Sequence, residues 1–382
     1  MKRIFSILMA AMMLLSGCAG TANESEPSQE PSNSETAEAL EQTPEGRTVV
    51  DHDGIEVDIP EQIDRIAVGN IGPMASVLTL FLGSGESIVG MSPMSMSAAE
   101  NGILGELFPE LLDADTSFLQ GSNINVEKLL TLEPDLVLIQ SGQSEVRTQL
   151  ENAGLTVVAF GVSTFKYDII NTYEAWIDLL SQIFPANDKM EEVTAYSKEV
   201  LELVQSRVSD IPEAERKRAL FLFQYDETQM IASGRNFFGQ YWCESAGAVN
   251  VAQDIEAGQA TITMEQVYEW QPDVIFITNF TNTKPADLYA NAVGSDDWSL
   301  VKAVQEQQVY KMPLGSFRTY SVSADMPVTL LWVAKTIYPD LFSDIDTDAE
   351  VKDFYQRIYG VTLTDEQVAA MYDPQGDVAY GM

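Results

Sequence analysis

The chain has 382 residues, of which 58 are Asp or Glu and 21 are Lys or Arg, so its formal net charge is −37. A surface this acidic repels phosphate backbones and excludes nucleic-acid binding as a main function. One histidine and two cysteines exclude a three-histidine metal site and a disulfide-rich scaffold, and a hydrophobic fraction of 45% excludes a wholly disordered chain.

The first residues predict an export signal with a lipid anchor. Two cations precede a mostly apolar run at 4–15, which is too short to cross about 30 Å of hydrocarbon but suits a signal peptide. The run leads into LSGC, which resembles a bacterial lipobox. We therefore expect residues 1–17 to be a signal peptide and Cys18 to be the site of lipidation. An ordinary signal peptide followed by a chance cysteine is the alternative.

Residues 18–46 predict an acidic linker. The segment TANESEPSQEPSNSETAEALEQTPEG holds seven Glu among Ser, Pro and Thr, and it has too few apolar side chains to form a core. Repulsion between its charges favours an extended tether. We expect it to connect the lipid in the membrane to a soluble body outside the cytoplasm.

From residue 47 onward, strand and helix patterns alternate. A hairpin pattern at 48–60 turns at Asp53-Gly54. Strands that alternate with helices predict an α/β fold, with a mostly parallel sheet covered on both faces, so we assign 47–185 to an N-terminal α/β lobe. The predicted strands are at 64–70, 86–91, 135–140 and 155–160, and the predicted helices are at 73–83, 125–134 and 144–154.

The second part of the chain repeats this scheme. The segment TMEQVYEWQPDVIFIT (263–278) aligns with NVEKLLTLEPDLVLIQ (125–140) at a constant offset of 138 residues. A strand pattern at 217–226 and a helix pattern at 236–251 match the first strand and helix of the N-terminal lobe. These matches predict an internal duplication, with a C-terminal α/β lobe and a helical extension at 211–382.

Two helical patterns lie between the lobes. The first covers 167–184 and ends at Pro185, and the second runs from about 187 to 209. The second would span about 35 Å, which is close to one domain diameter. We therefore predict two Rossmann-like lobes with mostly parallel sheets, joined by a single long α-helix at 186–210.

These features together resemble class III periplasmic solute-binding lipoproteins, the iron-siderophore and vitamin B12 branch that feeds ABC importers. The resemblance rests on TVVDHDGIEVDIPEQIDRIAV, NVEKLLTLEPDLVLI, TMEQVYEWQPDVIFI and the long helix, and it covers roughly 47–340. It implies a monomeric binding protein rather than an enzyme, without a catalytic residue, a resident cofactor or a metal. Its partners would be an ABC permease dimer with its ATPase and a ferric chelate of the siderophore type.

Glu127 and Glu265 are candidates for docking to the permease. Each lies two residues after a predicted helix N-cap, where the helix dipole favours a carboxylate by about 0.3–1 kcal/mol. That local role explains either one alone. The resemblance implies more, because glutamates at these positions in the family insert into arginine pockets on the two permease subunits.

The ligand is expected between the lobes, at the carboxyl ends of the strands. Arg235 resembles the arginine that pairs with catecholates in siderophore-binding members, and a surface cation is the alternative. Arg318 and Tyr320 lie where relatives have an aromatic residue at the cleft rim. The predicted ligand-binding residues are Asn70, Met74, Met94, Met96, Ser141, Gln143, Tyr225, Arg235, Phe237, Asn279, Phe280, Arg318 and Tyr320.

Some features bear on the kind of cargo. The second arginine that the family has after the strand at 274–278 is replaced by Asn279 and Phe280, which favours a less charged chelate, such as a hydroxamate, a corrinoid or haem, over a tri-catecholate. Cobalamin, haem or an oxyanion on the same fold is the alternative. Met91, Met94 and Met96 could bind a soft metal, but methionines more often line apolar pockets. A cell-surface hydrolase is disfavoured because the chain has no P-loop, GxGxxG after a strand, or GxSxG motif.

Overall fold

The computed structural model describes residues 47–381. The signal peptide, Cys18 and the acidic linker predicted for 1–46 lie outside the described residues. Among residues 47–381, no helix is both long and apolar enough to span a membrane.

The first lobe is built on a four-stranded sheet with the strand order β4-β3-β7-β8, in which every neighbouring pair is parallel. The predicted hairpin is present as an antiparallel pair, and Gly54 at its turn has a φ of 75°, which glycine adopts without strain. The elements are β1 (Arg47–Val50), β2 (Glu56–Ile59), β3 (Ile66–Val68), α1 (Met74–Leu82), β4 (Ile88–Gly90), α2 (Pro93–Asn101), α3 (Leu104–Leu107), β5 (Leu119–Gln120), β6 (Asn123–Ile124), α4 (Val126–Leu130), β7 (Leu136–Gln140), α5 (Ser144–Asn152), β8 (Val157–Phe160) and α6 (Ile169–Ile183).

The second lobe has a six-stranded sheet with the order β12-β10-β9-β13-β14, in which β11 also pairs with β9. Its centre is parallel, but β10 and β12 are antiparallel to their neighbours, which the strand patterns of the sequence do not predict. The elements are β9 (Arg218–Tyr225), β10 (Met230–Ser233), α8 (Phe238–Ser245), β11 (Val249–Asn250), β12 (Gln259–Thr261), α9 (Met264–Trp270), β13 (Val274–Ile277), α10 (Pro285–Tyr289), α11 (Lys302–Gln305), β14 (Val309–Lys311) and α12 (Met326–Ile337).

The duplication is visible in hydrogen bonds as well as in the order of elements. Helices α4 and α9 begin 138 residues apart, as do strands β7 and β13. In the first lobe, the Asp135 carboxylate accepts from the backbone N–H of Arg65, and the Arg65 side chain donates to the carbonyl of Leu132. In the second lobe, Asp273 and Arg218 repeat both bonds, with the carbonyl of Trp270 as acceptor. The repeated Pro-Asp pair therefore fixes the start of a central strand in each lobe.

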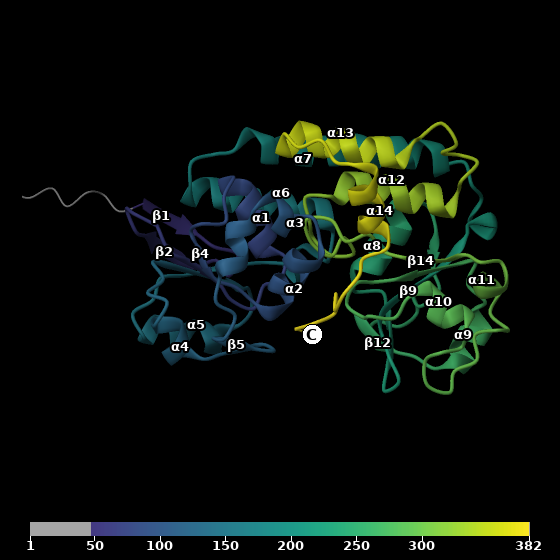
Figure 1. The fold of residues 1–382 in the computed structure, drawn as a ribbon, viewed down its shortest axis with the longest axis horizontal. Helices are drawn as coiled ribbons and strands as arrows, with labels where there is room; N and C mark the ends of the chain where they lie inside the picture. The colour runs from purple at the N-terminus through teal and green to yellow at the C-terminus, as the bar shows by residue number, and fades with distance from the viewer. Residues whose placement is uncertain (1–46, 382) are drawn as a thin grey trace, which may run out of the picture. The chain divides into compact units, whose positions relative to one another are not determined.

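A long helix and a C-terminal extension connect the lobes. The helix predicted at about 187–209 is α7 (Asp188–Val208), and the side chain of its N-cap Asn187 accepts from the Lys189 N–H. It packs on α6 of the first lobe and on α8 and α12 of the second. The extension forms α13 (Thr347–Tyr359), which runs along α7, and α14 (Asp365–Tyr372), and Figure 1 places the C-terminus between the lobes.

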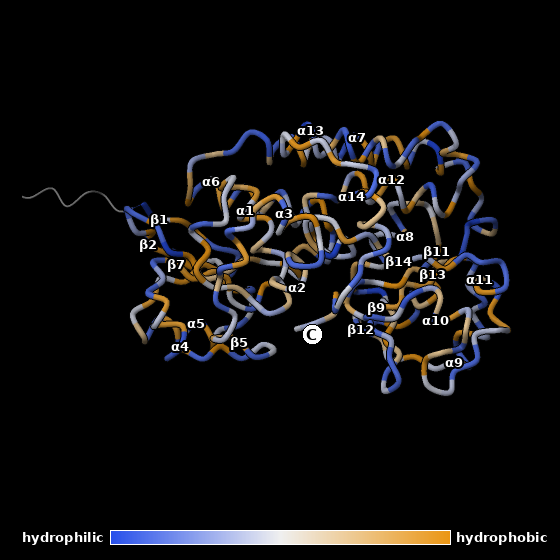
Figure 2. The backbone as a smooth tube through the Cα atoms, in the orientation of Figure 1, coloured by the Kyte–Doolittle hydropathy of each residue, from blue (hydrophilic) through white to orange (hydrophobic). Residues whose placement is uncertain are grey.

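The core follows the strands. The central strands β7, β9 and β13 are buried along most of their length, and Figure 2 shows hydrophobic residues concentrated there. Because the sheets are covered on both faces, these strands are continuous apolar runs rather than alternating ones. Polar side chains are thus restricted to the strand ends, where the candidate site residues lie. The lobe limits themselves, 47–185 and 211–382, stay a prediction.

Candidate functional site

Three predicted residues of the first lobe come together where β3 and β7 end. The Asn70 side chain follows β3, and its Oδ1 accepts from the Gln140 N–H at 3.3 Å. Its Nδ2 donates to the Gln143 side chain. The turn at Ser141–Gln143 is therefore attached to the end of the neighbouring strand, and Asn70, Ser141 and Gln143 are all partly accessible.

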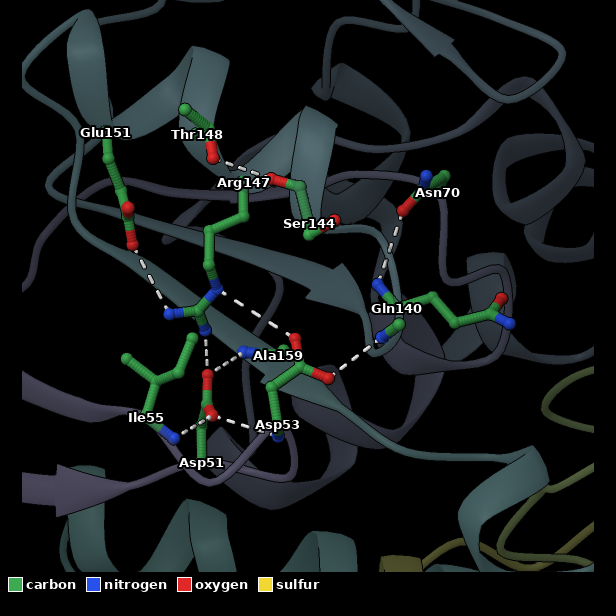
Figure 3. A network of polar contacts seen from close by, with 11 residues as sticks. Asp51, Asp53, Ile55, Asn70, Gln140, Ser144, Arg147, Thr148, Glu151 and Ala159 are labelled. Atoms are coloured by element: carbon green, nitrogen blue, oxygen red, sulfur yellow. Dashed lines mark hydrogen bonds and ion pairs between the residues drawn. The ribbon is translucent and has the colours of Figure 1, made fainter.

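A buried ion-pair network supports this turn from below (Figure 3). The Asp53 carboxylate in the β1–β2 hairpin accepts from the Gly142 N–H at 2.8 Å. Its neighbour Asp51 accepts from the Arg147 guanidinium and from the N–H groups of Ile55 and Ala159. The side chains of Asp51 and Arg147 are 0% and 4% exposed. The hairpin thus holds the 141–143 turn in place through charge and backbone hydrogen bonds.

The predicted methionines have different surroundings. Met74 is fully buried in the core of the first lobe, so its side chain has no access to a ligand in this conformation. Met94 and Met96 are partly exposed on α2, which follows β4. Gly72 lies against the Met94 sulfur and the Phe317 ring, since a Cβ there would meet both. Met94 therefore lies where the first lobe meets the second.

An aromatic cluster of the second lobe faces the first lobe. The Phe237 ring lies 5.0 Å from Phe223 and 5.9 Å from Tyr320, measured between ring centroids. Phe280 packs on the same Phe223 ring at 4.9 Å. From the first lobe, Tyr167 reaches Phe237 at 5.3 Å in an edge-to-face contact. Phe237, Phe280 and Tyr320 thus form one cluster, which an aromatic ring from the opposite lobe joins. Tyr320 is fully buried rather than at a rim, and its contact with a ligand stays a prediction.

Arg318 is fully buried beside this cluster. It lies in the loop after β14, and its guanidinium stands over the Phe280 ring at 4.8 Å. Its Nη2 donates to the Tyr380 carbonyl at 3.0 Å, whereas Nε and Nη1 have no partner among the described residues. Burial lowers the pKa of Arg318 to about 9, and the negative charge of Asp377 partly offsets this shift. This guanidinium has two unused donors in an enclosed apolar setting, which suits the oxygens of an anion.

A buried aspartate holds the loop that carries Arg318. The Asp325 carboxylate accepts from the Ser316 N–H at 2.8 Å and from the Tyr355 hydroxyl of α13 at 2.5 Å. Burial raises the pKa of Asp325, which these hydrogen bonds partly oppose. Residues 311–330 are buried throughout. The helical extension therefore helps to position the loop of Arg318 through Asp325.

Three predicted residues have hydrogen-bond partners within the second lobe. The Arg235 side chain is half-exposed, donates to the Gln253 carbonyl at 2.7 Å and lies 3.8 Å from Asp254. Asn279 is fully buried, and its Nδ2 donates to the carbonyls of Met312 and Pro313. Tyr225 is buried too, and its hydroxyl donates to Asp296 at 2.9 Å. Contact between these side chains and a ligand stays a prediction, and in this conformation each has a structural partner instead.

Sequence reasoning missed three contributors to the site. Tyr167 follows β8 in a left-handed conformation with a φ of 59°, whereas the sequence pattern assigns it to a helix. The Lys311 ammonium is buried and donates to the carbonyls of Thr278, Thr281 and Thr283, which fixes the loop that carries Phe280. The third contributor is the C-terminal segment 373–381. The location of Tyr167 in the loop between β8 and α6 is the signal that could have indicated it.

Two cavities lie at opposite ends of the strands of the second sheet. One of about 370 Å³ is at the carboxyl ends of β9 and β13, lined in part by Tyr225, Phe280, Asn282 and Ala379. A larger one of about 570 Å³ lies at the amino ends and is lined by Lys217 and Asp273 among others. Ligands of parallel α/β sheets bind at the carboxyl ends, so the smaller cavity is adjacent to the candidate site.

Residues 76–314 match the family described as periplasmic binding protein. The chain belongs to this family. It is 24% identical to the molybdate-binding protein MolA of Haemophilus influenzae over 343 residues, which cover 85% of this chain and 93% of MolA. It is 21% identical to the iron(3+)-hydroxamate-binding protein YxeB of Bacillus subtilis over 324 residues, covering 83% and 90%.

Solved structures agree with the fold. A periplasmic solute binding protein from Veillonella parvula superposes with a TM-score of 0.75 at 28% identity, covering 85% of this chain and 96% of that one. MolA bound to molybdate superposes with a TM-score of 0.71 at 23% identity, covering 83% and 99%. The predicted class III fold is confirmed, and the chain is a substrate-binding protein of an ABC importer.

The binding protein presents both predicted docking glutamates to solvent. Glu127 is exposed in the first turn of α4, where the Asn125 side chain caps the helix. Glu265 is exposed in the first turn of α9, where Thr263 forms a capping box with Gln266. Figure 1 shows α4 and α9 along the same edge of the two lobes. Their spatial arrangement suits simultaneous contact with one partner, and the docking role itself stays a prediction.

Proposed function

We propose that this protein captures a small oxyanion between its two lobes and delivers it to a membrane importer. The observation that carries the proposal is the fully buried Arg318, whose Nε and Nη1 have no partner among the described residues. A buried donor without an acceptor costs about 1–3 kcal/mol, and more when it is charged. An anion that accepts from one of these nitrogens together with Nη2 forms a charge-assisted bidentate pair and relieves part of that cost.

The surroundings of Arg318 favour a small anion over a bulky one. The loop on which it lies is buried, and Leu314 and Gly315 pack against Gly102 of the first lobe. Lys311, the nearby second cation, already donates to three carbonyls. One available guanidinium in an enclosed site matches an anion with one or two charges. The 24% identity to MolA across 85% of the chain supports the same class of cargo.

A ferric chelate of the siderophore type is the second candidate. It is favoured by the aromatic cluster, in which Tyr167 and Phe237 remain partly accessible and come from opposite lobes. A hydroxamate chelate carries little charge and would contact these rings over a wide area. The similarity to YxeB supports it. Such a cargo requires the lobes to separate further than an oxyanion does.

Titration of the purified protein separates the two candidates. Molybdate and ferrioxamine B are each added, and binding is measured by calorimetry. The proposal expects saturable molybdate binding that weakens about 10- to 100-fold in Arg318→Gln, because a hydrogen-bonded charge is worth about 1.5–3 kcal/mol. Arg218→Gln is the matched control, since that arginine is exposed at the amino end of β9. Binding of ferrioxamine B alone, unchanged in Arg318→Gln, would reject the oxyanion.

A parallel variant tests the alternative arginine. Arg235→Gln is expected to bind molybdate like the natural protein, because the Arg235 side chain is engaged by Gln253 and Asp254 on the surface. If Arg235→Gln loses binding and Arg318→Gln keeps it, Arg235 is the residue that holds the cargo, and the assignment to Arg318 is wrong.

The delivery step uses the two glutamates and the lipid anchor. We propose that Glu127 and Glu265 dock the loaded protein onto the two permease subunits, with Cys18 lipidated at the outer face of the membrane. Support comes from the exposure of both carboxylates and from α7, which packs on both lobes and limits their movement. Docking between charged groups would be salt-dependent. No catalytic role is proposed for any residue.

A further inference from the structure

The C-terminal segment 373–381 lies between the lobes and is hydrogen-bonded to both. The Ser97 hydroxyl on α2 of the first lobe donates to the Asp377 carbonyl at 2.7 Å. On the second lobe, the Asn282 side chain donates to the Asp377 carboxylate at 2.6 Å and accepts from the Ala379 N–H at 3.1 Å. A single short segment thus contacts both walls of the candidate site.

This segment also reaches the candidate ligand-binding residues. The Tyr380 carbonyl accepts from Arg318 Nη2 at 3.0 Å, and Ala379 lines the cavity beside Phe280. Arg318 has no exposed surface while the segment is in place. The segment therefore gives Arg318 two things that a bound anion would give it. The Tyr380 carbonyl oxygen accepts a hydrogen bond from the guanidinium, and Asp377 places a negative charge near it.

The sequence of the segment suits this close approach. Gly376 and Gly381 have φ values of 82° and 88°, which glycine adopts without strain. A Cβ at Gly376 would overlap Asn101, and a Cβ at Gly381 would overlap the backbone at Met94. Val378 between them is only 3% exposed. The segment is packed into the space between the lobes rather than resting on the surface.

We propose that residues 373–381 are an internal competitor that occupies Arg318 in the cargo-free protein and that cargo binding displaces. This inference rests on the proposed function, because it requires Arg318 to be the cargo-binding group. An anion would take Nη2 from the Tyr380 carbonyl together with Nε or Nη1, which have no partner within residues 47–381. The measured affinity is then the intrinsic affinity reduced by the fraction of molecules in which the segment is released.

The first test weakens the attachment of the segment without touching Arg318. Asn282→Ala removes the hydrogen bonds to Asp377 and Ala379, so the segment is released more often. We expect the dissociation constant for molybdate to fall about 10-fold, as two hydrogen bonds of about 0.5–1.5 kcal/mol would give. Asn236→Ala is the matched control, because that exposed side chain donates to the Glu256 carbonyl in the same lobe. An unchanged or weaker affinity in Asn282→Ala would overturn the inference.

A second variant ends the chain at Asp373 and keeps the test independent of Asn282. It should bind molybdate at least as tightly as Asn282→Ala, and the peptide DPQGDVAYGM should compete for its site. Weaker binding after truncation would make the segment part of the cargo site rather than its competitor. Hydrogen exchange adds a direct readout, because the Ala379 amide should exchange faster once molybdate is added. Unchanged exchange at saturating molybdate would contradict displacement.

The outcomes separate this inference from the proposed function. Binding that depends on Arg318 but is equal in the full-length and truncated proteins overturns the competitor and leaves the proposed function intact. Binding of molybdate by the truncated protein alone supports both. Absence of molybdate binding in every variant overturns both.

Discussion

The buried pair between Arg147 and Asp51 predicts a large, local loss of stability when Arg147 is replaced by Met. The side chains are 4% and 0% exposed, so the variant leaves a buried carboxylate without its counter-charge. Breaking such a pair costs about 3–5 kcal/mol. Asp51 keeps the backbone N–H donors of Asp53, Ile55 and Ala159, which places the expected loss near the lower limit, about 3 kcal/mol.

The measurement is urea denaturation at pH 7, followed by tryptophan fluorescence. Trp176 is a reporter in the same lobe, because it is buried and donates to the Gly161 carbonyl. For about 335 folded residues, a loss of about 3 kcal/mol corresponds to a fall of about 4 °C in thermal midpoint. Lys198→Met is the control, since the Lys198–Glu174 pair is about half-exposed and is expected to contribute under about 1 kcal/mol.

The double variant Asp51→Asn/Arg147→Met tests the cause of that loss. Removing the stranded charge together with its partner should recover part of the free energy of unfolding. A loss in Arg147→Met no larger than that in Lys198→Met would refute the reasoning. So would a double variant whose stability equals the sum of the two single losses.

Three further predictions concern pH, the Arg318 loop and docking. Burial lowers the pKa of His52, whose Nδ1 accepts from the Gly161 N–H. The folded protein therefore binds fewer protons than the unfolded chain, and its stability should fall as pH drops below about 6.5. In His52→Gln, the urea midpoint should change less between pH 7.5 and 5 than it does in the natural protein. Asp325→Ala leaves the Ser316 and Tyr355 donors unpaired and should lower the free energy of unfolding by about 2–4 kcal/mol. The control Ser343→Ala, at an exposed position, should lower it by less than about 0.5 kcal/mol. Equal urea midpoints for the two variants would contradict this prediction. The double variant Glu127→Lys/Glu265→Lys should leave the affinity for molybdate unchanged but reduce uptake into proteoliposomes that contain the importer, and the reduction should be larger at low salt. The control double variant Glu145→Lys/Glu269→Lys should not reduce uptake.

The fold could be predicted largely because its signals are local and repeated. Paired Pro-Asp segments indicated the duplication, and the structure explains their recurrence by the shared bonds of Asp135 and Asp273 to the start of a neighbouring strand. The antiparallel strands β10 and β12 could not be predicted, since they are only four and three residues long.

The site was less predictable, because side-chain direction depends on distant partners. Arg235 and Arg318 both follow strand regions, yet the Gln253 carbonyl holds one at the surface and the Phe280 ring covers the other. Asn279 follows a strand as predicted, but it supports the 312–313 backbone. Nothing in the sequence indicated that residues 373–381 return to the first lobe over about 280 positions to bond with Ser97.

A crystal structure of the protein grown with molybdate, in which the metal is located by its anomalous scattering, tests the central claim most directly. The account predicts one anomalous peak between the lobes, with the anion accepting from the Arg318 guanidinium and the Tyr380 carbonyl withdrawn from Nη2. A peak elsewhere, or a cleft in which the Tyr380 carbonyl still accepts from Arg318 at saturating molybdate, would contradict it.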